Sequence, residues 1–131
     1  MSRALSIRKN QVAEIWPVFR KYLRIVWPEH MEKVLFQALR GHYQLWLVLH
    51  DVDVQGMFVT SVNVKEGSKV VELIYLTGSF TRADFRVIKQ AVCAMQEHSN
   101  ALRVEGIPDF KAPRFLKRLG GHTDDNLIWS N

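Results

Sequence analysis

An acidic residue interrupts an apolar run near the middle of the chain. Glu72 follows Val70-Val71 and precedes Leu73-Ile74. A carboxylate on a half-buried strand is costly unless it is paired or faces a cleft, so Glu72 is a candidate functional residue. Tyr75 lies in the same run and carries a hydroxyl that can transfer a proton. The alternatives are an outward-facing Glu72 paired with a neighbouring lysine, and a Tyr75 that packs as an ordinary strand aromatic.

Two groups of basic residues could bind anions. Arg82, Arg86 and Lys89 are spaced at i, i+4 and i+7, so on a helix they share one face and could hold phosphates by their side chains. The alternative is an ordinary solvated helix face. A second basic group, which could contact an acidic protein or a phosphate backbone, consists of Lys111, Arg114, Lys117 and Arg118.

Other kinds of chemistry find little support in the sequence. The five histidines show no i, i+4 spacing and no H-E-x-x-H, so we expect no metal site. The chain also has no P-loop and no Gly-x-Ser-x-Gly. Cys93 is the only cysteine, which excludes an internal disulfide and favours a reducing, cytoplasmic setting. It falls in an apolar helical stripe, where we expect a buried, inert thiol. Nucleic-acid binding is disfavoured because no long basic run or aromatic-interleaved strand occurs.

Length and charge narrow the class of protein. The 131 residues fit one domain, 1–131, and the 18 Lys and Arg against 13 Asp and Glu give a net charge of +5, which favours acidic partners. The longest apolar runs are about five residues, far short of the roughly 20 needed to cross a bilayer. We expect residues 1–10, which carry charges, to belong to the folded domain and not to a signal peptide.

Helical periodicity predicts four helices. Apolar residues recur at helical spacing over 12–26, after a possible cap at Asn10, and again over 31–39, where Gly41 suits a helix end. Pro17 either kinks the first helix or marks a start near Trp16. The longest helix is predicted to follow Gly78 and to end at about Ser99, and a short one to cover 112–119.

Alternating and β-branched stretches predict the strands. The predicted strands cover 4–8, 43–49, 54–64, 69–76, 102–107 and 126–130. Short polar turns join the second, third and fourth strands, which favours an antiparallel meander. The long helix between 69–76 and 102–107 then makes a crossover and implies one parallel pair. The predicted fold class is α+β, with a mixed, mainly antiparallel sheet flanked by helices in the order β-α-α-β-β-β-α-β-α-β.

This order resembles the GNAT superfamily of acyl-CoA-dependent N-acetyltransferases over nearly the whole chain. It is most similar to the small GNAT-like proteins encoded by bacteriophages. Four short motifs carry the resemblance: Trp16-Pro17, the Gln-Leu-Trp-hydrophobic-Val strand from Gln44 to Val48, the Gly-x-x-Val-Thr strand from Gly56 to Thr60, and Leu-x-Gly from Leu76 to Gly78.

The resemblance implies a V-shaped opening beside strand 69–76, where acetyl-CoA binds with its pyrophosphate at the start of the next helix. Members of the superfamily carry Gln/Arg-x-x-Gly-x-Gly/Ala there, because glycines let the backbone approach the phosphates. In this chain Phe85 and Val87 stand at the two small-residue positions, and Asp84 adds a negative charge. The residues expected at the cofactor, from the resemblance and from the spacing of the basic residues together, are Leu76, Gly78, Arg82, Arg86 and Lys89.

A second signature of the superfamily is Asn-x-x-Ala followed by a helix with a tyrosine that protonates the departing thiolate. Asp109-Phe-Lys-Ala112 matches with Asp for Asn, but Leu116 stands where the tyrosine is expected. Tyr75, Tyr22 and Tyr43 are the tyrosines that remain as proton donors.

Two functions follow from these observations. The first is a GNAT-fold protein with a degenerate acetyl-CoA site that binds a protein partner, either a host target or a virion component. The second is an active N-acyltransferase on an amine or lysine substrate, with Glu72 as the base and Arg82 and Arg86 at the cofactor. Both place the protein in the cytoplasm, or in the virion if a phage encodes it.

Overall fold

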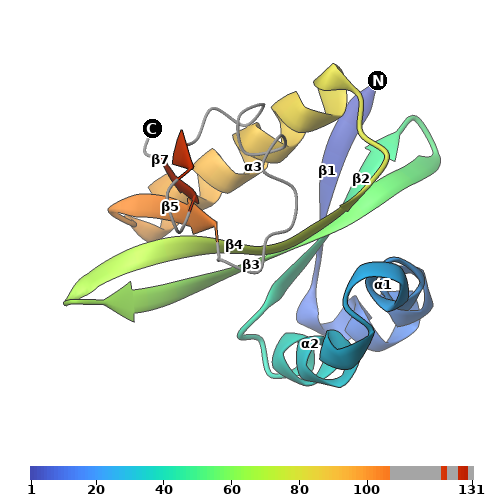
Figure 1. Ribbon diagram of the computed structural model, residues 1–131, viewed down its shortest axis with the longest axis horizontal. Helices are drawn as coiled ribbons and strands as arrows, with labels where there is room; N and C mark the ends of the chain where they lie inside the picture. Colours follow the sequence, from blue (N-terminus) through green and yellow to red (C-terminus); the bar gives the residue numbers. More distant parts are fainter. Residues whose placement is uncertain (107–121, 124–126, 130–131) are drawn as a thin grey trace.

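The computed structural model describes residues 1–106, 122–123 and 127–129 (Figure 1). Short 3-10 turns at Lys9–Gln11 and Pro28–His30 precede the first two helices. In chain order the elements are β1 (Ser2–Ile7), α1 (Val12–Val26), α2 (Met31–Leu39), β2 (Gln44–His50), β3 (Asp53–Lys65), β4 (Ser68–Gly78), α3 (Arg82–Ser99), β5 (Arg103–Gly106), β6 (His122–Thr123) and β7 (Leu127–Trp129).

The strands form one sheet in the order β1-β2-β3-β4-β5-β7-β6. All neighbouring pairs are antiparallel except β4 and β5, which are parallel, as the crossover through the long helix predicted. The predicted α+β class with a mixed, mainly antiparallel sheet is therefore confirmed. The predicted closing strand corresponds to β7, whereas the two-residue β6 was not predicted, and the predicted helix over 112–119 lies outside the described residues.

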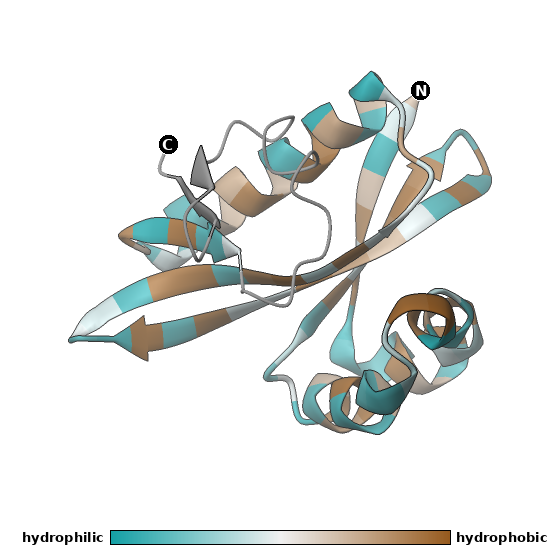
Figure 2. Ribbon diagram, viewed as in Figure 1, coloured by the Kyte–Doolittle hydropathy of each residue, from teal (hydrophilic) through white to brown (hydrophobic). Residues whose placement is uncertain are grey.

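Helices cover both faces of the sheet (Figure 1). Helices α1 and α2 lie on one face, where Phe19, Leu23 and Val34 are fully buried against strand residues such as Met57. Helix α3 lies on the other face and buries Phe85, Ile88 and Val92. The apolar stretches of β3 and β4 run between these two layers (Figure 2), so each face of the central strands contributes to a core.

Helix α1 runs from Val12 to Val26 with Pro17 inside it, so the predicted alternative of a start near Trp16 is wrong. Proline has no N–H, so the carbonyl of Ala13 loses its i+4 partner at this point. Burial of Phe19 and Leu23 on the following turns holds the helix to the sheet despite this loss. Helix α2 ends as predicted, with Gly41 at φ +82°.

Strand β4 carries an irregularity that the sequence did not predict. Val59 pairs with Tyr75 and Thr60 with Leu73, so Ile74 is an extra residue on β4. Because the bulge shifts the alternation, Leu73 and Leu76 pack in the α3 cluster while Tyr75 packs in the α1 and α2 cluster. Pairing with β5 ends at Leu73 and Gly106, so within the described residues β4 continues beyond its parallel neighbour.

Burial along α1 predicts the effect of shortening its side chains. Leu23→Ala removes a fully buried side chain and is expected to lower the free energy of unfolding by about 3 kcal/mol, through lost transfer energy and a cavity. Ile25→Ala, two residues away and 77% exposed, is expected to change it by less than about 0.5 kcal/mol. Urea unfolding followed by circular dichroism measures both values, and equal losses would contradict this packing.

Candidate functional site

The N-terminus of helix α3 is capped by a reciprocal pair of hydrogen bonds. The backbone N–H of Thr81 donates to Asp84 Oδ2 at 2.8 Å, and the backbone N–H of Asp84 donates to Thr81 Oγ1 at 3.2 Å. This is a capping box, in which the first and fourth residues of the helix start satisfy one another's amides. The side chain of Asp84 is completely buried, so the first turn of α3 contains an internal carboxylate.

The surroundings of Asp84 keep this carboxylate ionised. Burial alone would raise the pKa of Asp84, but the hydroxyl of Ser2, the hydrogen bonds with Thr81 and the nearby ring of His50 lower the pKa below its usual range. Ser2 and His50 face each other across β1 and β2, with Ser2 Oγ 3.4 Å from His50 Nδ1. The start of α3 therefore lies near the edge of the sheet, and Asp84 Oδ1 is buried there without a hydrogen-bond partner among the described residues.

Some of the backbone donors around this turn are used within the protein. Ser79 N donates to the carbonyl of Gln55 at 2.9 Å, and Phe85 N donates to the carbonyl of Thr81 at 3.1 Å. With the capping box, the N–H groups of Thr81 and Asp84 are also taken and do not face an anion at the helix start.

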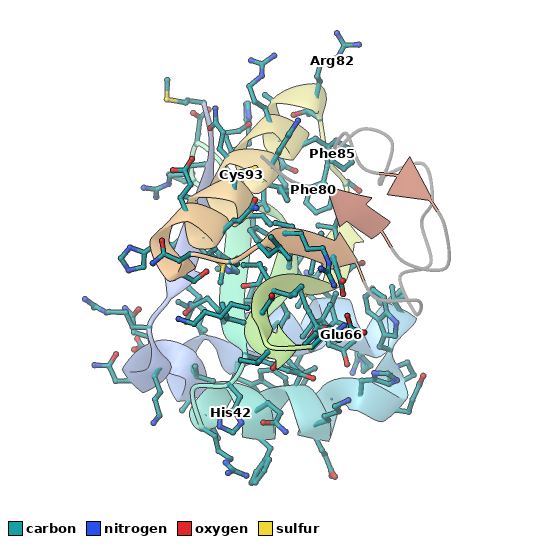
Figure 3. All side chains as sticks on the ribbon, turned by 90° about the vertical axis from the view of Figure 1, so that its left-hand side faces the viewer. His42, Glu66, Phe80, Arg82, Phe85 and Cys93 are labelled. Carbon is teal, nitrogen blue, oxygen red and sulfur yellow. The ribbon has the colours of Figure 1, made fainter. Side chains whose placement is uncertain are left out.

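Two aromatic rings fill the connection between β4 and α3, which is only three residues long. Phe80 lies edge-on to Phe85, with ring centroids 5.4 Å apart, and both rings lie near the start of α3 in Figure 3. A side chain at Gly56 would overlap the Phe80 ring and the carbonyl of Thr77, and one at Gly78 would overlap the backbone of β3. The glycines at this point make room for an aromatic ring of the protein itself.

The three basic residues predicted on one helix face line a common pocket. Arg82, Arg86, Lys89 and Phe85 are its described lining residues. The three basic side chains are exposed, and within the described residues they form no ion pair. They provide positive charge beside the start of α3, but by flexible side chains and not by backbone groups.

Glu72 lies in a buried polar cluster on β3, β4 and β5. Its carboxylate accepts a hydrogen bond from Asn63 and lies 3.6 Å from Lys65 Nζ. The same Lys65 ammonium is 2.9 Å from Glu105, which also pairs with Arg103 Nε at 2.6 Å. The alternative prediction, that Glu72 pairs with a neighbouring lysine, agrees with these contacts. The Glu72 side chain is buried, however, and does not face outward as that alternative assumed.

The ion pairs of this cluster shift the ionisation of its members. Burial alone would raise the pKa of Glu105, but hydrogen bonds and charge interactions with Lys65 and Arg103 lower the pKa below its usual range. The hydrogen bond to Glu105 is the main reason why the pKa of Lys65 is raised. Lys65 and Glu105 are therefore both held in their charged forms.

Tyr75 is buried on β4, and the extra residue Ile74 separates it along the strand from Leu73 and Glu72. Its hydroxyl lies 2.7 Å from His30 Nδ1, and its ring meets the rings of Trp27 and His30 edge-on at 5.0 and 5.6 Å. His30 Nε2 is in turn 3.6 Å from Glu29. Sequence reasoning did not identify His30, because its partner is 45 residues away and no spacing pattern joins them.

The remaining candidates have simpler outcomes. Cys93 is half-buried on α3 and not fully buried as expected (Figure 3), because its position lies at the edge of the apolar stripe.

Lys111, Arg114, Leu116, Lys117 and Arg118 lie outside the described residues. Among the residues that the structure describes, no group of three His, Cys, Asp or Glu side chains could hold a metal ion. No helix in the described ranges has the length and apolar character needed to cross a membrane.

A scan against models of protein families and a search of curated proteins give no match. Solved structures do resemble this chain. An aminoglycoside N-acetyltransferase in complex with CoA has a TM-score of 0.70 and 17% identity, covering 100% of this chain and 94% of that chain. A ribosomal-protein-alanine N-acetyltransferase from Brucella melitensis biovar Abortus 2308 has a TM-score of 0.67 and 12% identity, covering 100% and 96%. The fold is therefore that of the GNAT acetyltransferases.

At the start of α3, the pyrophosphate of the cofactor that this fold implies would meet the buried carboxylate of Asp84. A pyrophosphate bound by the helix N-terminus needs free backbone N–H groups and a positive local potential. Here the amides of Thr81 and Asp84 are used in the capping box, and the buried carboxylate of Asp84 already neutralises the helix end. The exposed side chains of Arg82, Arg86 and Lys89 lie beside this turn and could attract phosphates.

The ionised state of Asp84 predicts a pH dependence of stability. Because the pKa of Asp84 is lowered on folding, its contribution is fully present above the unfolded value near 4 and is lost as pH falls through the folded value. Asp84→Asn is expected to cost about 2 kcal/mol at pH 6, because it weakens charge-assisted bonds. The difference between wild type and variant is expected to shrink below about pH 4. Urea unfolding from pH 6 to acid measures it, and a constant difference would contradict the assignment.

Proposed function

We propose that this GNAT-fold protein has a degenerate acetyl-CoA site and acts by binding a protein partner. The observation that carries the proposal is the fully buried, hydrogen-bonded carboxylate of Asp84 in the first turn of α3. It provides the negative charge that a helix N-terminus favours and uses a donor that a pyrophosphate would need. With its anion site filled by its own side chain, the helix serves as a rigid support.

Opening the capping box for a cofactor would be unfavourable. Hydrogen bonds to charged groups contribute about 1.5–3 kcal/mol each, and a diphosphate at this position would repel the buried carboxylate. The carboxylate of Asp84 also lies close to Ser2 of β1, so a rearrangement of the turn would change the surroundings of the edge strand.

The exposed basic residues support a partner with an acidic surface. Arg82, Arg86 and Lys89 stand on one rigid helix without ion pairs in the described part of the chain. Unpaired surface cations attract an acidic protein at long range and orient its approach. The basic group at Lys111, Arg114, Lys117 and Arg118 adds positive charge to the chain. The resemblance to bacteriophage-encoded GNAT-like proteins extends the proposal to a host target or a virion component as the partner.

Titration calorimetry with acetyl-CoA, and separately with CoA, tests the cofactor side of the proposal. We expect at most weak binding at low salt that disappears at about 0.15 M salt, because only exposed side chains contribute. Arg82→Ala with Arg86→Ala should abolish this weak binding. Arg20→Ala with Lys21→Ala, which removes the same charge from the exposed part of α1, should preserve it.

Micromolar binding that survives salt would overturn the degenerate site. It would support an active N-acyltransferase on an amine or lysine substrate, in which Glu72 is the base. Release of thiol from acetyl-CoA in the presence of an amine would then be the next measurement, with Glu72→Gln as the variant.

The partner side of the proposal predicts a stable complex. Affinity purification of the full chain from its native source, followed by mass spectrometry, should give a protein partner. Reversing the charges of Arg82 and Arg86 to Glu should weaken the complex at least tenfold, whereas the same change at Arg20 and Lys21 should not. The absence of any stable partner, in the cell or in a virion, would count against the proposal.

A further inference from the structure

A groove of about 860 Å³ lies between β1, β2 and α3. Its sides are small residues: Ser2, Ala4 and Ser6 from β1, and Ala91 and Ala94 from α3. Larger side chains at these positions would fill the space. The groove therefore exists because both β1 and α3 carry small residues here.

The floor of the groove is rigid. Trp46 stacks on Phe58 with an interplanar angle of 6° and a centroid separation of 5.2 Å. Its indole N–H donates to Thr60 Oγ1 at 3.0 Å, and the Thr60 hydroxyl donates to Met95 Sδ at 3.1 Å. Trp46 and Met95 both line the groove, so its apolar surface is held in place before any partner binds.

The groove borders an open edge of the sheet. β1 is the first strand in the sheet order and pairs only with β2 among the strands of the described residues (Figure 1). Every second residue of β1 lines the groove, and the backbone groups on the outer side of this strand can accept a further strand.

We infer that an extended segment of a partner protein adds to the sheet along β1 and places alternate apolar side chains in the groove over Trp46 and Met95. Strand addition of this kind takes affinity from main-chain hydrogen bonds and specificity from pockets for alternate side chains. The inference rests on the proposed function and names the chemistry of the partner: a β-strand with large apolar residues at every second position.

A second copy of this chain would not fill the groove. In a two-fold antiparallel pair the same faces of both β1 strands lie together, so Ser2, Ala4 and Ser6 of one copy would lie beside those of the other. These small side chains would leave the apolar floor uncovered. A different protein with larger side chains is the better occupant.

Charge at the rim adds a second requirement. Arg3 and His98 line the groove, and no carboxylate does so among the described lining residues. Acidic residues at the ends of the partner segment would therefore pair favourably with the rim, while the centre of the segment remains apolar.

A synthetic octapeptide tests the inference. It alternates leucine with threonine, carries a glutamate at each end, and is added at about 1 mM, in the range of weak peptide affinities. We expect it to slow amide hydrogen exchange in β1, and we expect Ala94→Leu to weaken its binding about tenfold by filling the groove. Ala94 is exposed and leucine is a good helix former, so this variant keeps the fold.

Two controls separate strand addition from other binding. Leu5→Gln changes the opposite face of β1 and should leave binding within about twofold, since surface changes away from a contact have small effects. A peptide with the same side chains and N-methylated alternate amides should not bind, because it cannot form the main-chain bonds.

Unchanged β1 exchange with the octapeptide, or binding unaffected by Ala94→Leu, would overturn the inference. A dimer in sedimentation that Ala94→Leu dissociates would also overturn it, since the groove would then hold a second copy. The result is independent of the cofactor test: tight acetyl-CoA binding would defeat the proposed function and leave the peptide experiment unchanged.

Discussion

The hydrogen bonds between Thr81 and Asp84 fix the point at which helix α3 begins, and much of the structure depends on that point. They allow the chain to turn from β4 into α3 within three residues. The helix then lies across the sheet with Phe85, Ile88 and Val92 in the core. The carboxylate of Asp84 is buried and lies close to Ser2, so the start of α3 and the edge strand β1 meet at this side chain.

The space around α3 is filled at the helix start and open on the side that faces β1. Toward the loop that precedes the helix, the amides of Thr81 and Asp84 are used in the cap, and the Phe80 ring lies beside Gly56 and Gly78. Toward β1, the short side chains of Ala91 and Ala94 leave a gap above a rigid floor. Two proteins can thus share the order and arrangement of their helices and strands and still differ in where their surfaces form pockets.

The sequence predicted the order of elements well because hydrophobic periodicity is a local property. It also contained the pattern Thr81-x-x-Asp84 before an apolar helix, which is the signature of a capping box and was the signal available for the cap. The bulge at Ile74 was not predictable from alternation, since an apolar run hides a one-residue shift. Likewise the contact of Tyr75 with His30, and the sharing of Lys65 between Glu72 and Glu105, depend on which strands and helices meet in the fold.

The buried carboxylates argue for a protein whose polar groups are mainly structural. Asp84 is bound by Thr81, Glu105 by Lys65 and Arg103, and Glu72 by Asn63 with Lys65 nearby. A general base works best when its pKa lies near the working pH, whereas these contacts lower the pKa of both Asp84 and Glu105. Such pairs hold strands and helix ends in register, and removing one partner leaves an uncompensated buried charge. The same contacts that stabilise the sheet therefore leave these two carboxylates poorly suited to take a proton from a substrate.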